Sequence, residues 1–228
     1  MNKLSLILTL TLLTFLTNKF SAQNGNSNIT NGNTNRETLV MRSGYKSTIE
    51  TKGSPYLYKE YKKARIANNK VLVDMRYNAY KDEIDIVNNG QNMTIYKRTE
   101  YSPIHIIDSD EYLYLLEYPF KGKNLTGYLF EVKKFADFAI FMKISKDYEK
   151  GRYAQDSFDI DKENSYEDLP DIFYIQKSNG EILEMPNRKK KLIEIFPDKK
   201  DKIEKTIKTD KIDTQNLNTL SQIFTALS

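Results

Sequence analysis

The densest group of side chains that could do chemistry in this chain is a run of carboxylates in residues 156–171. Oxygen ligands at alternate positions suit Ca²⁺, and Asp159, Asp161 and Glu163 follow the start of an EF-hand loop. The match then fails, because the sixth position of that frame lacks glycine and the twelfth lacks glutamate. Three interpretations remain: a solvated acidic loop, a weak calcium site at these residues, and a hydrolase that uses carboxylates of the loop.

His105 is the only histidine and the other candidate for acid–base chemistry. It lies in an apolar run, residues 104–107, and no G-x-S-x-G motif supplies a serine nucleophile. A zinc site usually draws on several His or Cys side chains, and this chain has no cysteine. We therefore interpret His105 as a strand residue, and we expect neither catalytic residues nor a cofactor.

Tyrosine is the residue type that most favours a binding surface here, with sixteen copies and no tryptophan. Tyr56 and Tyr58 lie on one segment, and Tyr112 and Tyr114 lie on another. Tyrosine combines a large apolar face with a hydroxyl, which suits contact with sugars or partner proteins. It suits the strands of a half-buried sheet equally well, so both interpretations stay open.

These side chains must be positioned by a β-rich body, which we place at residues 39–186. Apolar residues alternate with polar ones along the chain, as in residues 71–77, and Asn89-Gly90 and Asn179-Gly180 are hairpin signals. The turns recur every 8–15 residues or so, which favours an antiparallel β-meander or a partly closed sheet over βαβ units. Strands are predicted at residues 71–77, 83–86, 93–95, 104–107, 112–118, 128–132, 138–144, 172–176 and 182–185.

Three short helices are predicted in residues 187–228, packed on the body. Asn187, Asp198 and either Asp213 or Thr214 are the expected N-terminal caps. The third helix should bury one apolar stripe, formed by Leu217, Leu220, Phe224 and Leu227. The fold class is therefore α+β, with the sheet first and the helices last. The many lysines of this tail suit contact with an acidic polymer or an anionic membrane surface. Because acids lie among them, they suit a solvated helix face as well.

Residues 1–22 have the three-part layout of a secretory signal peptide. A positive start at Lys3 precedes an uncharged apolar core of residues 4–16, and small residues end at Ala22. That core is shorter than the roughly 20 residues of a membrane-spanning helix. Residues 23–38 are almost entirely Asn, Gly, Ser, Thr and Gln, which predicts a disordered linker. We expect export to the periplasm or the outside, with an uncleaved anchor as the alternative.

The composition excludes several classes of protein. Hydrophobic residues make up 39% of the chain, enough for a packed core. The net charge of +4 includes two lysines of the signal peptide, which leaves +2 and gives no reason to expect nucleic acid. The absence of cysteine excludes thiol catalysis and disulfides, and no second long apolar segment predicts a transmembrane helix.

A corner at residues 76–85 is the densest local pattern, and a hairpin turn is expected from Asn78 to Asp82. This corner, together with the preceding Gly-Ser-Pro-Tyr-Leu at residues 53–57, resembles a family of exported β-rich proteins common in Bacteroidota. So does the ending, with Phe-Tyr-Ile at residues 173–175 before a Lys-rich tail. The resemblance implies export and a sheet-plus-helix body. That family has no assigned activity, so no catalytic position carries over.

The sequence favours a soluble, non-enzymatic binding or interaction module of the bacterial envelope or secretome. Its expected partner is an envelope protein, a glycan or another surface ligand. The first alternative is a carrier or sensor of a lipid-like ligand, with the sheet enclosing a cavity and the helices as its lid. The second is the carboxylate-dependent hydrolase.

Overall fold

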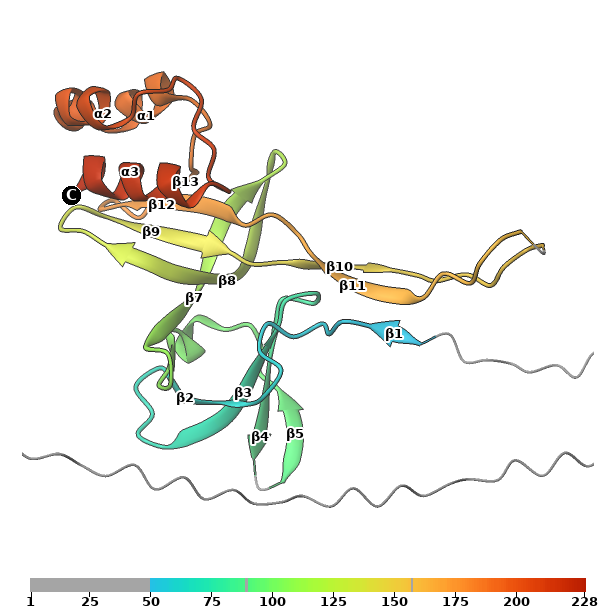
Figure 1. Cartoon of the computed structure of the whole chain (residues 1–228). Helices are drawn as coiled ribbons and strands as arrows, with labels where there is room; N and C mark the ends of the chain where they lie inside the picture. The colour runs from blue at the N-terminus through green and yellow to red at the C-terminus, as the bar shows by residue number, and fades with distance from the viewer. Residues whose placement is uncertain (1–49, 89, 157) are drawn as a thin grey trace, which may run out of the picture. The chain divides into compact units, whose positions relative to one another are not determined.

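The computed structural model of the chain describes residues 50–88, 90–156 and 158–228. All of them belong to one contact unit, Ser47–Ser228. The expected signal peptide (1–22) and linker (23–38) lie outside the described residues, so export stays a prediction. The β-rich body followed by helices near the C-terminus is confirmed (Figure 1).

Most strands of the described residues form one large antiparallel sheet, with every neighbouring pair antiparallel. Each expected strand is present within a few residues of its predicted bounds. The order across the sheet is β13 (Ile182–Glu184), β12 (Ile172–Lys177), β9 (Phe138–Lys143), β8 (Lys123–Lys134), β7 (Glu111–Phe120), β6 (Ile104–Ile106), β2 (Lys62–Ile66), β3 (Leu72–Asn78), β4 (Glu83–Asn88) and β5 (Gln91–Thr94).

The turns between the strands follow from residues that accept a positive φ. Gly90 has φ +77° in the tight β4–β5 hairpin, where Asn88 faces Gln91. Asp82 has φ +57° at the end of the β3–β4 turn, a conformation that Asp and Asn tolerate better than most side chains do. The expected turn over residues 78–82 is therefore confirmed.

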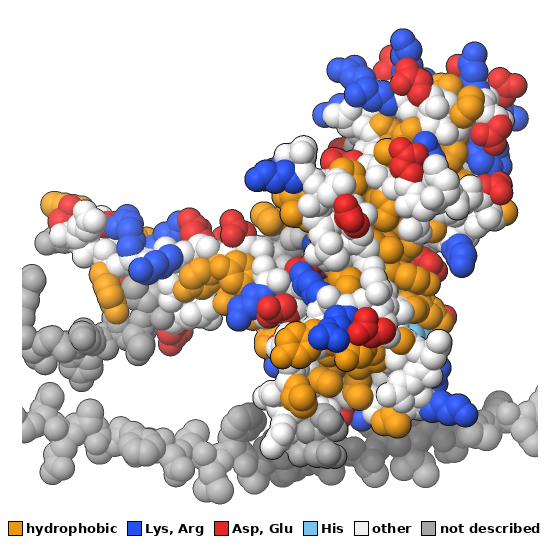
Figure 2. Space-filling view, turned by 180° about the vertical axis from the view of Figure 1, so that it is seen from behind, with side chains coloured by type: hydrophobic (Ala, Val, Ile, Leu, Met, Phe, Trp, Pro, Cys, Tyr) orange, Lys and Arg blue, Asp and Glu red, His pale blue; other side chains and the backbone are white. Residues whose placement is uncertain are grey.

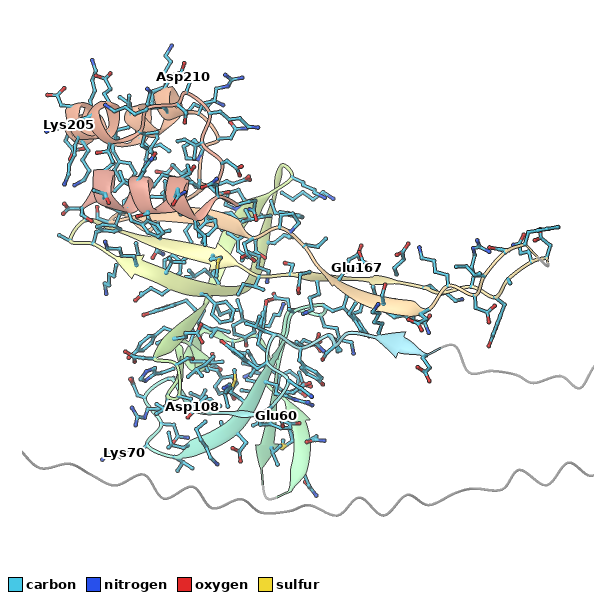
Figure 3. The ribbon with its side chains drawn as sticks, in the orientation of Figure 1. Glu60, Lys70, Asp108, Glu167, Lys205 and Asp210 are labelled. Carbon is cyan, nitrogen blue, oxygen red and sulfur yellow. The ribbon has the colours of Figure 1, made fainter. Side chains whose placement is uncertain are left out.

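A second, three-stranded sheet was not predicted. β10 (Lys146–Glu149) and β11 (Asn164–Asp168) pair antiparallel, and β1 (Thr51–Lys52) adds to β11 in parallel. Glu167, labelled in Figure 3, marks β11 on this arm, which we call the β10–β11 arm. These strands could not be recognised from the sequence, because charged strands with little apolar content show no clear alternation of apolar and polar residues. β2 was missed for the same reason.

The helices that follow the sheet are α1 (Lys189–Ile195), α2 (Lys200–Thr206) and α3 (Leu217–Leu227), with 3₁₀ turns η1 (Thr99–Tyr101) and η2 (Pro197–Lys199) elsewhere in the described chain. The predicted caps were wrong. Asn216 caps α3, accepting hydrogen bonds from the backbone N–H of Asn218 and Thr219. The N-cap residues of α1 and α2 are Arg188 and Lys199, and neither makes a side-chain capping hydrogen bond.

The helices bury one face against the sheet, and the apolar stripe expected on α3 needs one correction. Leu227 is fully buried, whereas Leu217 is 81% exposed and lies outside the stripe. In Figure 3 side chains fill the space between the helices and the strands. The buried residues of this layer are Phe138, Ile140, Phe173, Ile175, Met185, Leu192, Phe196, Ile203, Ile207, Ile212, Ile223, Ala226 and Leu227.

Two further apolar clusters lie elsewhere on the large sheet. One, which we call the β2–β6 cluster, is centred on β2, β3, β4 and β6 and contains Met75, Tyr77, Ile84, Ile104, Ile106 and Leu113. The other contains Tyr118, Leu129, Ala139, Phe141 and Tyr174, on the face of β9 opposite the helices. Its end beside Tyr118 adjoins the candidate site.

Candidate functional site: a lysine–aspartate pocket

One surface pocket brings together charged side chains that are largely withdrawn from water. Its volume is about 390 Å³, within the range of small-molecule sites. We call it the lysine–aspartate pocket. Its walls come from five separate parts of the chain: Ala79, Tyr80, Asp82, Lys97, Tyr118, Phe120, Leu125, Thr126, Lys143, Ser145, Lys146, Leu169, Pro170 and Ile172.

Asp82 reaches this pocket because the β3–β4 turn is held in place from both sides. The side chain of Asn78 accepts a hydrogen bond from the backbone N–H of Lys81 at 3.0 Å. The backbone N–H of Ala79 donates to the carbonyl of Pro55 at 2.8 Å, and the carbonyl of Ala79 accepts from the N–H of Lys146 at 3.1 Å. The turn is thereby joined to the chain just after β9.

Lys143 is the last residue of β9 and shares the face of Ala139 and Phe141. Its side chain is only 9% exposed, and its ammonium lies 2.5 Å from a carboxylate oxygen of Asp82. It also donates to the hydroxyl of Tyr77 at 3.0 Å and to the carbonyl of Tyr128 at 3.3 Å. Burial lowers the pKa of Lys143 and the charge of Lys97 adds to this, whereas Asp82 opposes both.

Asp82 is shared between two lysines. Its second carboxylate oxygen lies 2.6 Å from the ammonium of Lys97, while the first also accepts from the Tyr77 hydroxyl at 2.9 Å. Among the residues that the structure describes, Asp82 is the single carboxylate in the wall of the pocket. One negative charge therefore faces two positive ones, and the group keeps an excess of one positive charge.

Tyrosines surround this charged group. The ammonium of Lys143 lies 5.7 Å from the ring centroid of Tyr77 and 5.9 Å from that of Tyr118, both within cation–π range. Burial raises the pKa of Tyr118 to about 12, and the charge of Asp82 adds to the effect. The phenol is therefore neutral at physiological pH.

Gly127 in β8 makes the room that Asp82 occupies. A Cβ at this position would lie 2.3 Å from a carboxylate oxygen of Asp82 and 3.0 Å from the Tyr118 hydroxyl. No real Cβ makes a contact of 2.3 Å, so a side chain here must displace the carboxylate oxygen of Asp82 that contacts Lys97.

We expect Gly127→Ala to lower the free energy of unfolding by about 2 kcal/mol, the usual cost of overpacking. Denaturant unfolding followed by circular dichroism measures the change. Asn124→Ala, on the exposed part of the same strand, is the matched control and should stay within about 0.5 kcal/mol of wild type. Equal stability of Gly127→Ala and wild type would show that Asp82 does not pack against β8.

Comparisons of the chain with protein-family models, with curated proteins and with solved structures found no match. The candidate site therefore depends on the geometry alone.

Tyr58 packs against the β2–β6 cluster, whereas Tyr56 contacts Arg76 and Asp85 on the opposite face of β3 and β4. The hydroxyl of Tyr56 donates to Asp85 at 2.8 Å, and the guanidinium of Arg76 lies 3.8 Å from its ring centroid. Tyr58 donates to Glu111, and burial together with this carboxylate raises the pKa of the phenol. Tyr56 joins the segment before β2 to β4, and Tyr58 joins it to β7. Ligand binding by these two tyrosines stays a prediction.

Tyr112 and Tyr114 lie on the face of β7 that also carries Tyr118, opposite the face that joins the β2–β6 cluster. Tyr112 stacks on His105 with ring centroids 4.1 Å apart, and Tyr114 meets Phe141 edge-on at 5.4 Å. The lysine–aspartate pocket begins further along the same face, at Tyr118. The expectation of a tyrosine-built face thus pointed to this strand but not to the charged residues beside it.

The acidic run lies on the β10–β11 arm, and its carboxylates hold the arm together. Asp159 accepts from Arg152, with one contact at 3.0 Å, and from the backbone N–H groups of Gln155 and Ile160. Asp161 accepts from the N–H of Ala154 at 2.7 Å. Across the described ranges, no three His, Cys, Asp or Glu side chains gather as a metal site requires. Calcium binding at Asp159, Asp161 and Glu163 stays an untested prediction.

The Arg152–Asp159 contact makes a measurable pH prediction. The hydrogen bonds from Arg152 and the backbone lower the pKa of Asp159 to about 2, against about 3.9 in an unfolded chain. Any stabilisation of the arm by this contact is therefore present above about pH 4 and is lost as the pH falls through 2. In a ¹³C NMR titration we expect the Asp159 carboxyl to titrate near 2, and at a higher pH in Arg152→Gln. A midpoint near 4 in both proteins would contradict the contact.

The basic tail carries acids and bases side by side, as Figure 2 shows for the helical end. Lys189 contributes to packing, because its ammonium donates to the carbonyl of Ile207 at 3.3 Å and lies 3.5 Å from Asp210. Over the described part of the chain, no helix has the length and hydropathy that crossing a bilayer requires.

Proposed function

We propose that this chain is an exported, non-enzymatic binding protein whose β-rich body holds a ligand in the lysine–aspartate pocket. The observation that carries the proposal is the buried Asp82–Lys143 pair, shared with Lys97, at the wall of a pocket of about 390 Å³. Burying charges costs several kcal/mol per ion, and such groups in a cleft are candidates for a functional site.

Binding is favoured over catalysis by how these groups are engaged. The ammonium of Lys143 donates to three protein acceptors, and Asp82 accepts from two lysines, Tyr77 and the backbone N–H of Tyr128. Groups fixed in this way are suited to orienting a ligand by charge. The hydrolase alternative is less supported, because Asp159 and Asp161 serve the β10–β11 arm.

The lid arrangement of the carrier alternative is also less supported. The helices share one buried cluster with the sheet, which includes Leu192, Ile203 and Ile223, and this packing gives them a structural role. We propose that the sheet is partly closed instead by the β3–β4 turn. In support, Asp82 on this turn bonds to β8 and β9, which are not its neighbours in the sheet.

A larger hollow beside β5 is the competing place for a ligand. Its volume is about 590 Å³, and its wall is mostly apolar, with residues such as Met93, Ile95 and Tyr96. Glu100 is its single charged wall residue among those the structure describes, and it is 57% exposed. The lysine–aspartate pocket is preferred because its charged groups are withdrawn from water.

The proposal is tested by recovering what the pocket holds. The full-length chain is expressed in a bacterial host, and the exported protein is purified without denaturation. Native mass spectrometry then records the molecules bound to it. N-terminal sequencing should place the start just after Ala22. We expect a bound small molecule in the wild type and its loss in Lys97→Met. A chain that carries nothing, or the same molecule in both proteins, would overturn the proposal.

A further inference from the structure

We propose that the ligand of the lysine–aspartate pocket is an organic anion with an apolar body, its carboxylate or phosphate head held by Lys97 and its body by the apolar wall. The inference rests on the proposed function and names the ligand class of the same site.

The charge at one end calls for an anion. Asp82 neutralises one of the two lysines that it contacts, so one positive charge remains without a carboxylate in the described wall. Lys97 is the accessible member, with 33% of its side chain exposed against 9% for Lys143. An anionic head beside Lys97 would complete the charge balance in a partly desolvated place, where electrostatic attraction is stronger than in water.

A third lysine and two hydroxyls extend this end of the pocket. Lys146 also lines it, with 12% of its side chain exposed, and its partner Asp168 is 79% exposed and outside the wall. Thr126 and Ser145 line the pocket as well, and a hydroxyl of this type can donate a hydrogen bond to an oxyanion. The group thus combines positive charge with donors, as anion sites do.

The remaining wall is apolar and partly uncovered. It is formed by Ala79, Tyr80, Tyr118, Phe120, Leu125, Leu169, Pro170 and Ile172. Leu125 and Leu169 are 41% and 44% exposed, so an apolar ligand has surface to remove from water here. The volume of about 390 Å³ lies at the small end of ligand pockets, which favours a short-chain or single-ring compound.

The test compares ligands that share one body and differ in the head. Octanoate, octyl phosphate and neutral 1-octanol are titrated into the purified chain by calorimetry, with inorganic phosphate as the head alone. We expect octanoate or octyl phosphate to bind at least ten-fold more tightly than octanol and than inorganic phosphate. Which of the two anions binds tighter distinguishes a fatty-acid-like ligand from a lipid-phosphate headgroup.

Variants of Lys97 connect the preference to the pocket. Lys97→Met should remove the preference for the anion over octanol, and Lys97→Arg should retain it. Lys202→Met, at an exposed position on α2, is the control and should bind as wild type does. Circular dichroism melting of each variant confirms that it is folded before binding is compared.

Three results would overturn the inference. Octanol binding as tightly as the anions, or an unchanged preference in Lys97→Met, would show that charge does not select the ligand. A neutral molecule recovered by native mass spectrometry would overturn this inference and leave the proposed function standing. Recovery of no molecule would overturn the proposed function itself.

Discussion

Asp82→Asn should lower the free energy of unfolding by about 3 kcal/mol, because it leaves the buried ammonium of Lys143 without a counter-charge. The substitution keeps the shape of the side chain, and asparagine tolerates the positive φ of this position. The loss therefore reports on the charge and not on backbone strain. Denaturant unfolding followed by circular dichroism gives the value.

Asp110→Asn is the matched control for this experiment. Asp110 also has a positive φ, +54°, and its side chain is 83% exposed beside His105. An exposed pair contributes at most about 1 kcal/mol, so this variant should stay close to wild type. The double variant Asp82→Asn with Lys143→Met should be more stable than Asp82→Asn alone. Equal losses in the two single Asp→Asn variants would show that Lys143 is not a buried partner of Asp82.

Leu227→Ala should also cost about 3 kcal/mol, for a different reason. Leu227 is fully buried in the layer between α3 and the sheet. Truncating a buried leucine loses transfer free energy and leaves a cavity, which together cost about 2–5 kcal/mol. The measurement is again the free energy of unfolding.

Leu217→Ala supplies the control within the same helix. Leu217 is 81% exposed, so its truncation should change the free energy of unfolding by less than about 0.5 kcal/mol. The sequence predicts that both leucines belong to one buried stripe, whereas the structure buries only Leu227. This pair of variants distinguishes the two arrangements. A larger loss for Leu217→Ala than for Leu227→Ala would contradict the way that α3 docks.

The alternation of apolar and polar residues, together with the residue types at the turns, was sufficient to predict most of the large sheet. Residues 138–143 alternate between two buried faces, and Gly90 and Asp82 occupy the turns that their conformational freedom suits. The β10–β11 arm was not predicted, because its strands carry mostly charged and polar residues. Their tyrosines, Tyr148 and Tyr166, pack on each other and on Tyr80, a contact that the local pattern does not indicate. The cap of α3 was misplaced by two or three residues, the usual scale of error at a helix end.

The candidate site was predicted only in part. Asp82 was expected in a turn, and Tyr118 belongs to the β7 segment that was expected to carry a tyrosine face. Lys143 had one overlooked signal, since it is a charge at an inward position of an otherwise apolar strand. No feature of the local sequence indicated a role for Lys97 or Gly127. Their roles depend on contacts between β8, β9 and the β3–β4 turn, which local patterns do not encode.

The most direct test of the lysine–aspartate pocket is an NMR titration that follows the side chains themselves. The chain is labelled with ¹³C at lysine, and octanoate is added while the signals of the lysine Cε groups are recorded. We predict that the signals of Lys97 and Lys143 move together and saturate, and that Lys202 does not respond. Saturable binding of octanoate that leaves both signals unchanged would contradict the account.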